Sequence, residues 1–81
     1  MERLILSVVS PEKVLFEGSV EKVSLPGTLG AFVILPGHAP IISSLEKGTI
    51  RFVTEAEERT IEVHTGGFVE KNGGQISVCV Y

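Results

Sequence analysis

The sequence has no aspartate and a single cysteine, Cys79, and these absences limit the chemistry that the chain can perform. One cysteine cannot form an internal disulfide, and no cluster of cysteine and histidine offers a metal site instead. A Ser–His–Asp triad is excluded because all ten acidic residues are glutamate, and no Gly-x-Ser-x-Gly motif is present. No glycine-rich turn ends in Lys-Ser or Lys-Thr, which excludes a phosphate-binding loop. The sequence therefore predicts a non-catalytic chain without metal or cofactor.

Basic residues and long apolar runs are also scarce. The seven lysines and arginines are scattered and the net charge is −3, so no nucleic-acid partner is expected, because such binding needs several cations on one face. The apolar run Leu4–Val9 is too short for a signal peptide, and no stretch approaches the length of a membrane span. The single cysteine fits a reducing, intracellular compartment.

What the sequence does contain is a short-range pattern of turns and apolar runs. The 81 residues suffice for one domain, which we assign to residues 1–81. With 43% apolar and 21% charged residues, we expect a compact fold that leaves apolar surface for a partner. Short runs of Val, Ile, Leu, Phe and Thr between regular turns predict an all-β sandwich or barrel. The turn signals are Gly18, Pro26-Gly27, Pro36-Gly37, Lys47-Gly48, Gly66-Gly67 and Asn72-Gly73.

Strand alternation is clearest in the second half of the chain. In Arg59–Thr65, Ile61 and Val63 point one way, and the opposite, wet face carries His64, which we expect to be solvated. Gln75–Tyr81 alternates in the same way. There, Cys79 is expected to be a buried, inert thiol.

Two turns are predicted around these strands. Asn72-Gly73 favours a tight hairpin turn, whose central residues need positive φ, and it would pair Gly67–Lys71 with Gly74–Tyr81. Thr54–Arg59 is rich in helix-forming residues but too short to nucleate a helix, so we interpret it as a charged hairpin tip.

The first half of the chain contains two irregular patterns. Val20 is at an even position and Val23 and Leu25 are at odd positions, so strict alternation would place them on opposite faces of a strand. A bulge near Glu21-Lys22 would place all three side chains on one face. Leu4–Val9 is apolar on both parities, which indicates a strand covered by the core on one face and by another element or subunit on the other.

His38 lies in a stiff loop between Pro36 and Pro40, in which Gly37 allows a sharp turn. Two interpretations remain open. The histidine either satisfies its hydrogen bonds within the loop and holds the turn, or the loop is a preformed contact that binds a partner at little ordering cost.

Four motifs, in matching order along nearly the whole chain, resemble the epsilon subunit of bacterial F-type ATP synthases, called delta in mitochondria. The most specific is Pro-Gly-His-Ala-Pro at residues 36–40, within the run Leu35–Leu45. The others are Val8–Glu12 with Phe16-Glu17-Gly18, Pro26-Gly27-Thr28-Leu29-Gly30, and Gly66–Glu70 before the last strand.

The resemblance implies a flattened β-sandwich of about ten short strands. It also implies one copy per complex of a non-catalytic rotor subunit, beside the gamma subunit and on the membrane c-subunit ring. There it would couple proton or sodium movement to ATP synthesis, at the cytoplasmic face of the bacterial plasma membrane.

The family's interfaces map residue by residue onto this chain. The c-ring interface maps to Leu29, Gly30, Ala31, Phe32, Pro36, Gly37, His38, Ala39 and Pro40. The gamma interface maps to Ser10, Ile42 and Ser43. Since a few buried anchors dominate most interfaces, we expect Phe32 and the His38 loop to dominate ring binding.

One departure from the family is the end of the chain. Family members usually continue into an alanine-rich helical hairpin, which restrains ATP hydrolysis in many bacteria and binds ATP in some. This sequence ends at Tyr81, so neither role is carried over, and we expect a natural short form. The alternative from another class is a small single-strand-binding β-barrel, which would need exposed aromatic residues and a basic groove.

Overall fold

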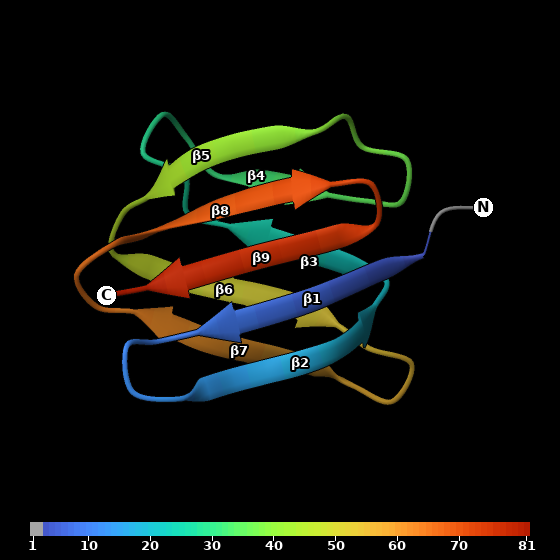
Figure 1. The fold of residues 1–81 in the computed structure, drawn as a ribbon, viewed down its shortest axis with the longest axis horizontal. Helices are drawn as coiled ribbons and strands as arrows, with labels where there is room; N and C mark the ends of the chain where they lie inside the picture. The colour runs from blue at the N-terminus through green and yellow to red at the C-terminus, as the bar shows by residue number, and fades with distance from the viewer. Residues whose placement is uncertain (1–2) are drawn as a thin grey trace.

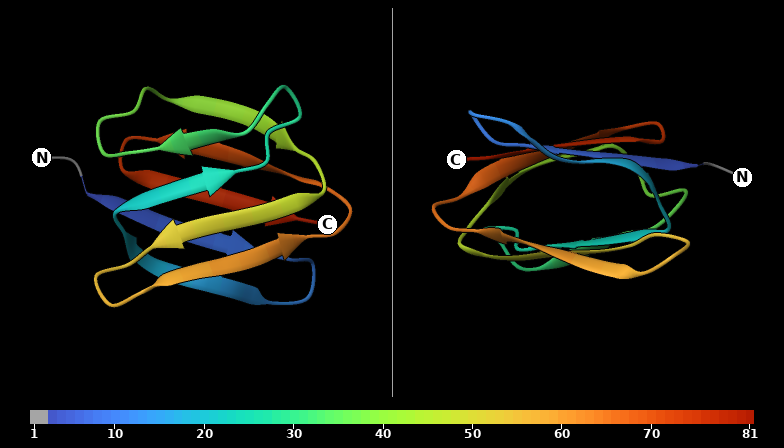
Figure 2. Two further views of the ribbon diagram at one scale, coloured as in Figure 1. Left: turned by 180° about the vertical axis from the view of Figure 1, so that it is seen from behind. Right: turned by 90° about the horizontal axis from the view of Figure 1, so that it is seen from below.

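The computed structural model describes residues 3–81, which form two β-sheets packed face to face (Figures 1 and 2). One sheet has the order β2-β1-β9-β8-β5 and the other the order β4-β3-β6-β7. The body measures 34 × 25 × 18 Å, so the predicted flattened β-sandwich is confirmed. The strands are β1 (Leu4–Val9), β2 (Val14–Val20), β3 (Lys22–Leu25), β4 (Phe32–Ile34), β5 (Ile41–Leu45), β6 (Gly48–Val53), β7 (Glu58–Val63), β8 (Gly67–Asn72) and β9 (Gln75–Val80).

One side of the sandwich is closed by the chain after β3. The backbone nitrogen of Thr28 donates to the carbonyl oxygen of Ser44 at 3.1 Å, and the backbone nitrogen of Glu46 donates to the carbonyl oxygen of Pro26 at 2.9 Å. Together with the bridge between Gly27 and Leu45, these bonds join the β3 end of one sheet to β5 of the other. Residues 26–28 thus link the two sheets on this side.

The core lies between the sheets and is built by the alternation of each strand. The predicted faces of β7 are confirmed: Val63 is buried and Ile61 half-buried, while Thr60, Glu62 and His64 are exposed. The buried apolar side chains are Leu4, Leu6, Val8, Val20, Val23, Leu25, Ile34, Leu45, Ile50, Phe52, Val63, Val69, Ile76, Val78 and Val80.

Strand β1 is an interior strand of its sheet, antiparallel to β2 and parallel to β9. Leu4, Leu6 and Val8 are buried in the core, as expected for one face of this strand. On the opposite face Ile5 and Val9 are half-buried. Neighbouring side chains therefore cover this outer face only in part within the chain itself.

The expected bulge near Glu21-Lys22 is wrong, although its consequence is correct. Val20, Val23 and Leu25 are all buried, but the chain changes sheets between them: β2 ends at Val20 and β3 begins at Lys22 in the other sheet. Because the two sheets face each other, the crossing brings both even and odd positions into the core without the extra residue of a bulge. The register shift in this region lies elsewhere, between Val8 and Val9 of β1.

The β8–β9 hairpin forms one residue later than predicted. Asn72 pairs with Gln75, so the two loop residues are Gly73 and Gly74 rather than Asn72 and Gly73. Gly73 has a φ of +60° and Gly74 has a φ that is not positive, the sign pattern of a type II′ turn. Glycine at the first central position accepts this φ without a Cβ clash, which leaves Asn72 free to extend the ladder.

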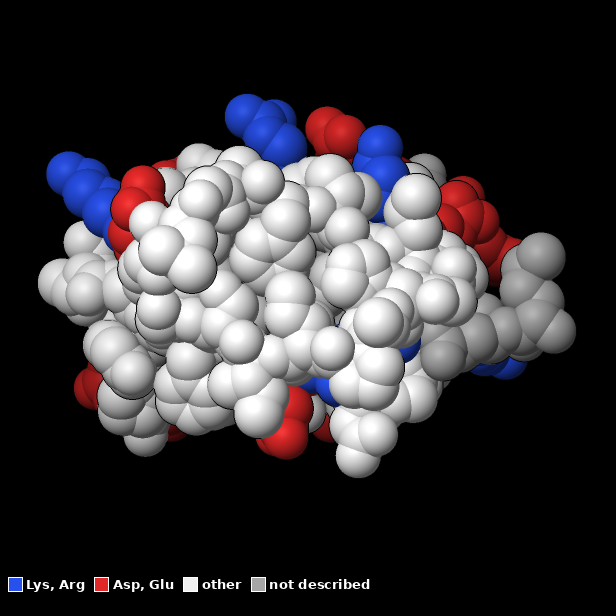
Figure 3. Space-filling model, turned by 90° about the horizontal axis from the view of Figure 1, so that it is seen from above, with Lys and Arg blue, Asp and Glu red and all other residues white. Residues whose placement is uncertain are grey.

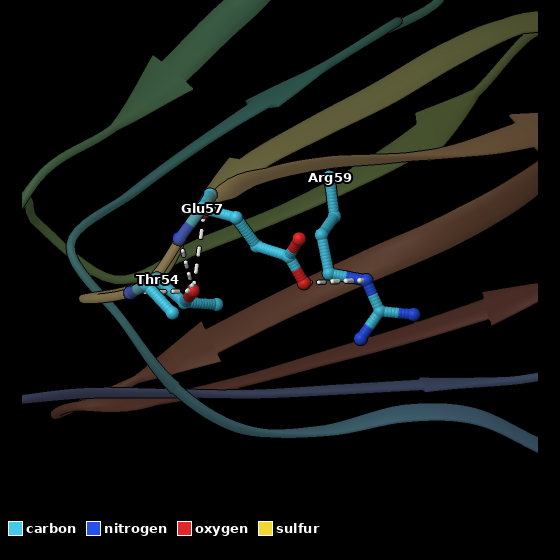
Figure 4. Close-up of polar contacts among 4 residues, drawn as sticks. Thr54, Glu57 and Arg59 are labelled. Atoms are coloured by element: carbon cyan, nitrogen blue, oxygen red, sulfur yellow. Dashed lines mark hydrogen bonds and ion pairs between the residues drawn. The ribbon is translucent and has the colours of Figure 1, made fainter.

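The tip between β6 and β7 is the predicted charged hairpin, held by Thr54 (Figure 4). The backbone nitrogen of Thr54 donates to the carbonyl oxygen of Glu57 at 2.8 Å. The Thr54 hydroxyl oxygen accepts from the backbone nitrogens of Ala56 and Glu57. Beyond the tip, Arg59 lies with its Nε 4.0 Å from a carboxylate oxygen of Glu57.

Candidate functional site

The nine residues mapped to the ring interface lie on one edge of the sandwich, eight of them in two loops and Phe32 at the start of β4. Residues 29–31 lie between β3 and β4, and Pro36–Pro40 lies between β4 and β5. Figure 1 places these loops at opposite ends of the long axis, on the side where β4 and β5 run as edge strands. We call residues 26–45 on this side the β4–β5 edge.

The loop at the β3 end is shaped by glycine. Gly30 has a φ of +132°, and its backbone nitrogen donates to Gly27 O at 3.0 Å. A Cβ on Gly27 would lie 2.8 Å from a ring carbon of Phe32, so this glycine lets the aromatic ring lie against the backbone. Phe32 is accordingly half-buried and packs on the core. Leu29, in contrast, is fully exposed at the loop's tip.

The Pro36–Pro40 loop is held largely by its own hydrogen bonds. The backbone nitrogen of His38 donates to Leu35 O at 3.0 Å, and its Nδ1 donates to Ala39 O at 2.7 Å. Gly37 has a φ of +87°, which a glycine adopts without strain. The imidazole is half-buried and bonded within its loop, as the turn-holding interpretation requires. A preformed loop of this kind also fits the contact interpretation, because little order is lost on binding.

A residue that the sequence analysis did not single out contacts this loop from inside. Lys71 of β8 is buried, and its Nζ donates to His38 O at 2.6 Å. The sequence did contain a signal for this burial. Lys71 is two residues from Val69 on the same strand, so both side chains point to the same face of the sheet.

Between the two loops, the β4–β5 edge carries no charged side chain. Residues 23–45 contain no Lys, Arg, Asp or Glu. Figure 3 looks down on this side and shows a broad, almost entirely uncharged surface, with most charged groups around its rim. Of the seven exposed large apolar side chains among residues 3–81, four belong to this segment: Leu29, Val33, Leu35 and Ile42. Such a surface is typical of a protein-binding site.

The three residues mapped to the gamma interface do not form one patch. Ile42 is 77% exposed on the outer face of β5, and Ser43 points the other way because side chains alternate along a strand. Ser10 lies in the β1–β2 turn, where its hydroxyl oxygen accepts from the backbone nitrogen of Lys13 at 3.3 Å. Since β9 and β8 separate β1 from β5, Ser10 is on the order of 14 Å or more from Ile42.

A row of side chains on the outer face of the β1-containing sheet connects these two positions. The register aligns Val9 with Cys79, Cys79 with Phe68, and Phe68 with Ser44. Phe68 is exposed, and Cys79 is half-buried on this outer face rather than enclosed in the core as expected. The alternation of Phe68 against Val69 was the signal that this face is partly apolar.

Within residues 3–81, no group of three or more His, Cys, Asp or Glu side chains is placed to hold a metal ion. A groove of about 780 Å³ opens beside Pro36, but Arg3 in its lining already donates to Ser19 Oγ at 3.1 Å. In the part of the chain that is described, no helix is long and apolar enough to cross a membrane.

Comparison with known proteins gives a consistent result. Residues 3–81 match the family model described as the ATP synthase delta/epsilon chain, beta-sandwich domain. The chain is 40% identical over 76 residues to the ATP synthase epsilon chain of Leptospira interrogans, covering 94% of this chain and 59% of that protein. It is 37% identical over 71 residues to the epsilon chain of Chlorobaculum tepidum, covering 86% of this chain and 80% of that protein.

Solved structures share the fold. A chain in the Euglena gracilis mitochondrial ATP synthase OSCP/F1/c-ring structure superposes with a TM-score of 0.89 at 18% identity, covering 99% of this chain and 51% of that one. A chain in the Tetrahymena thermophila mitochondrial ATP synthase central stalk/c-ring structure has a TM-score of 0.76 at 14% identity, covering 95% of this chain and 62% of that one. The chain thus spans 51% to 62% of the length of these structural neighbours.

Proposed function

Because the chain belongs to the ATP synthase delta/epsilon family, through a beta-sandwich domain that matches residues 3–81, we propose that it is a non-catalytic subunit of an F-type ATP synthase central stalk. In this role it docks on the gamma subunit and on the c-subunit ring and couples ion-driven rotation to ATP synthesis. One copy acts in each complex, at the cytoplasmic face of the bacterial plasma membrane. The observation that carries this proposal is the family match over nearly the whole chain.

The ring contact is assigned to the β4–β5 edge. Its lack of charge supports the assignment, because a surface without charge loses little solvation energy when a partner covers it. Leu29 at one end and the Pro36–Pro40 loop at the other would contact the ring. Phe32 contributes less directly to ring binding than the resemblance implies. Its side chain packs on the core and supports the loop from below.

The gamma contact is assigned to the outer face of the β2-β1-β9-β8-β5 sheet. Ile42 and Phe68 are exposed there, and Val9 and Cys79 lie between them and the Ser10 turn. This row joins Ile42 and the Ser10 turn into one continuous surface, from which Ser43 points away. Covering it would also complete the burial of Ile5 and Val9, which remain half-exposed in the isolated chain.

Co-purification from native membranes tests the assignment. With an affinity tag on the gamma subunit, the chain should be recovered in a one-to-one ratio with gamma, together with ring subunits. Recovery of the chain free of every synthase subunit would overturn the proposal.

A further inference from the structure

Lys71 is the only charged side chain that is buried among residues 3–81, with 2% of its surface exposed. It lies in β8 on the face that packs into the core, beside Val69, and opposite Ile76 and Ile41 on the neighbouring strands. Burying an ammonium group is costly unless its donors are satisfied. The position therefore needs a compensating set of acceptors.

Two of its acceptors come from separate turns at the same end of the sandwich. Lys71 Nζ donates to His38 O and to Gly73 O, both at 2.6 Å. His38 belongs to the loop between β4 and β5, and Gly73 to the β8–β9 turn. Hydrogen bonds from a charged donor are shorter and stronger than neutral ones, particularly where water is excluded. The ammonium group thus joins the loop to the turn from beneath the surface.

This contact supplies what the loop's own bonds do not. The prolines at 36 and 40 fix two φ angles, and the His38 bonds fix the shape of the turn. These bonds lie within the loop, whereas the bonds of Lys71 tie the loop to the β8–β9 turn. A rotation that withdrew the His38 carbonyl would cost the buried ammonium group one of its hydrogen bonds.

We infer that Lys71 is a positioning residue for docking: it holds the Pro36–Pro40 loop in the orientation that meets the partner, without touching the partner itself. The docking part of this inference rests on the proposed function, whereas the effect on the loop does not.

The test compares Lys71→Met with Val69→Ala in the full chain. Methionine keeps an unbranched side chain of similar length but has no donor, and Val69 is a buried, apolar neighbour on the same strand face. Two amides are followed by hydrogen exchange: His38 N–H, bonded to Leu35 O, and Tyr81 N–H, bonded to Gly66 O at the far end of the sandwich. Binding to a purified gamma–ring assembly is measured in parallel.

For Lys71→Met we expect exchange at His38 to rise roughly tenfold or more while Tyr81 is unchanged, with ring affinity falling by a similar factor. For Val69→Ala we expect exchange to rise at both amides and ring affinity to stay unchanged.

Unchanged exchange at His38 in Lys71→Met would overturn the inference. A uniform rise in exchange, or loss of the fold, would also overturn it, because either result would give Lys71 only a general role in the core. A loosened loop with unchanged ring affinity would overturn its docking part. If the wild-type chain itself does not bind the ring, the proposed function fails, and the exchange data still decide whether Lys71 holds the loop.

Discussion

The guanidinium group of Arg59 lies over the ring of Phe16, with its carbon 5.2 Å from the ring centroid. Arg59 belongs to β7 and Phe16 to β2, the edge strands of the two sheets on the side away from the β4–β5 edge. Phe16 in turn contacts Phe52, with ring centroids 4.5 Å apart. The long arginine side chain therefore covers the open side of the core, and its inward-pointing charge discourages pairing of β7 with another chain.

Replacement of Arg59 by alanine should lower the free energy of unfolding by about 1 to 2 kcal/mol, because both the cation–π contact and the cover over two aromatic rings are lost. Urea denaturation gives this value. Arg51→Ala is the matched control, since Arg51 is exposed on the outer face of β6 and its loss should change stability by less than about 0.5 kcal/mol. Equal effects of the two substitutions would contradict the assigned role of Arg59.

Gly67→Ala should be among the most destabilising single-methyl additions. A Cβ at Gly67 would collide with the carbonyl oxygen of Cys79 and lie 3.1 Å from Val80 Cα, and a backbone neighbour cannot rotate away. We expect a loss of at least about 2 kcal/mol in thermal or urea unfolding. Gly18→Ala, whose Cβ would meet only the movable ring of Phe16, should cost clearly less. A reversed order would show that the β8–β9 ladder relaxes more easily than its geometry indicates.

The turn between β8 and β9 makes a separate prediction. Gly73→Ala should destabilise the chain by about 1 kcal/mol, because alanine at a φ of +60° meets steric strain. Gly73→Asn should cost less, since asparagine enters this region more readily. Unfolding curves of the two variants that coincide with wild type would argue against the observed turn.

Leu29→Glu separates docking from folding. Leu29 is fully exposed, so the substitution should change the free energy of unfolding by less than about 0.5 kcal/mol. It introduces a charge into a surface that has none, and desolvating that charge should weaken binding to the gamma–ring assembly by roughly tenfold or more.

Two comparison variants complete that experiment. Thr60→Glu adds the same charge on the outer face of β7 and should leave binding unchanged. Phe32→Glu should lower both stability and binding, because Phe32 is half-buried against the core. Wild-type affinity in Leu29→Glu would remove the β4–β5 edge from the ring interface.

Local patterns in the sequence predicted much of the sandwich, and two kinds of feature escaped them. The faces of β7 followed from alternation, and the sharp turns followed from glycine and proline. The change of sheet at Glu21 was missed because a sheet crossing and a bulge both move the buried side chains from even to odd positions. The role of Lys71 was missed because its acceptor at His38 lies 33 residues away along the chain. The motifs also gave no indication that the two segments mapped to the ring interface lie at opposite ends of one edge.

The most direct test of the account places a photo-crosslinking residue at Leu29 in one variant and at Thr60 in another, in the assembled enzyme. Leu29 is on the β4–β5 edge, and Thr60 is on the far strand of the sheet that contains β4. We predict that irradiation links position 29 to a c-ring subunit and that position 60 gives no link to the ring. A ring crosslink from position 60 with none from position 29 would contradict the proposed docking of this edge.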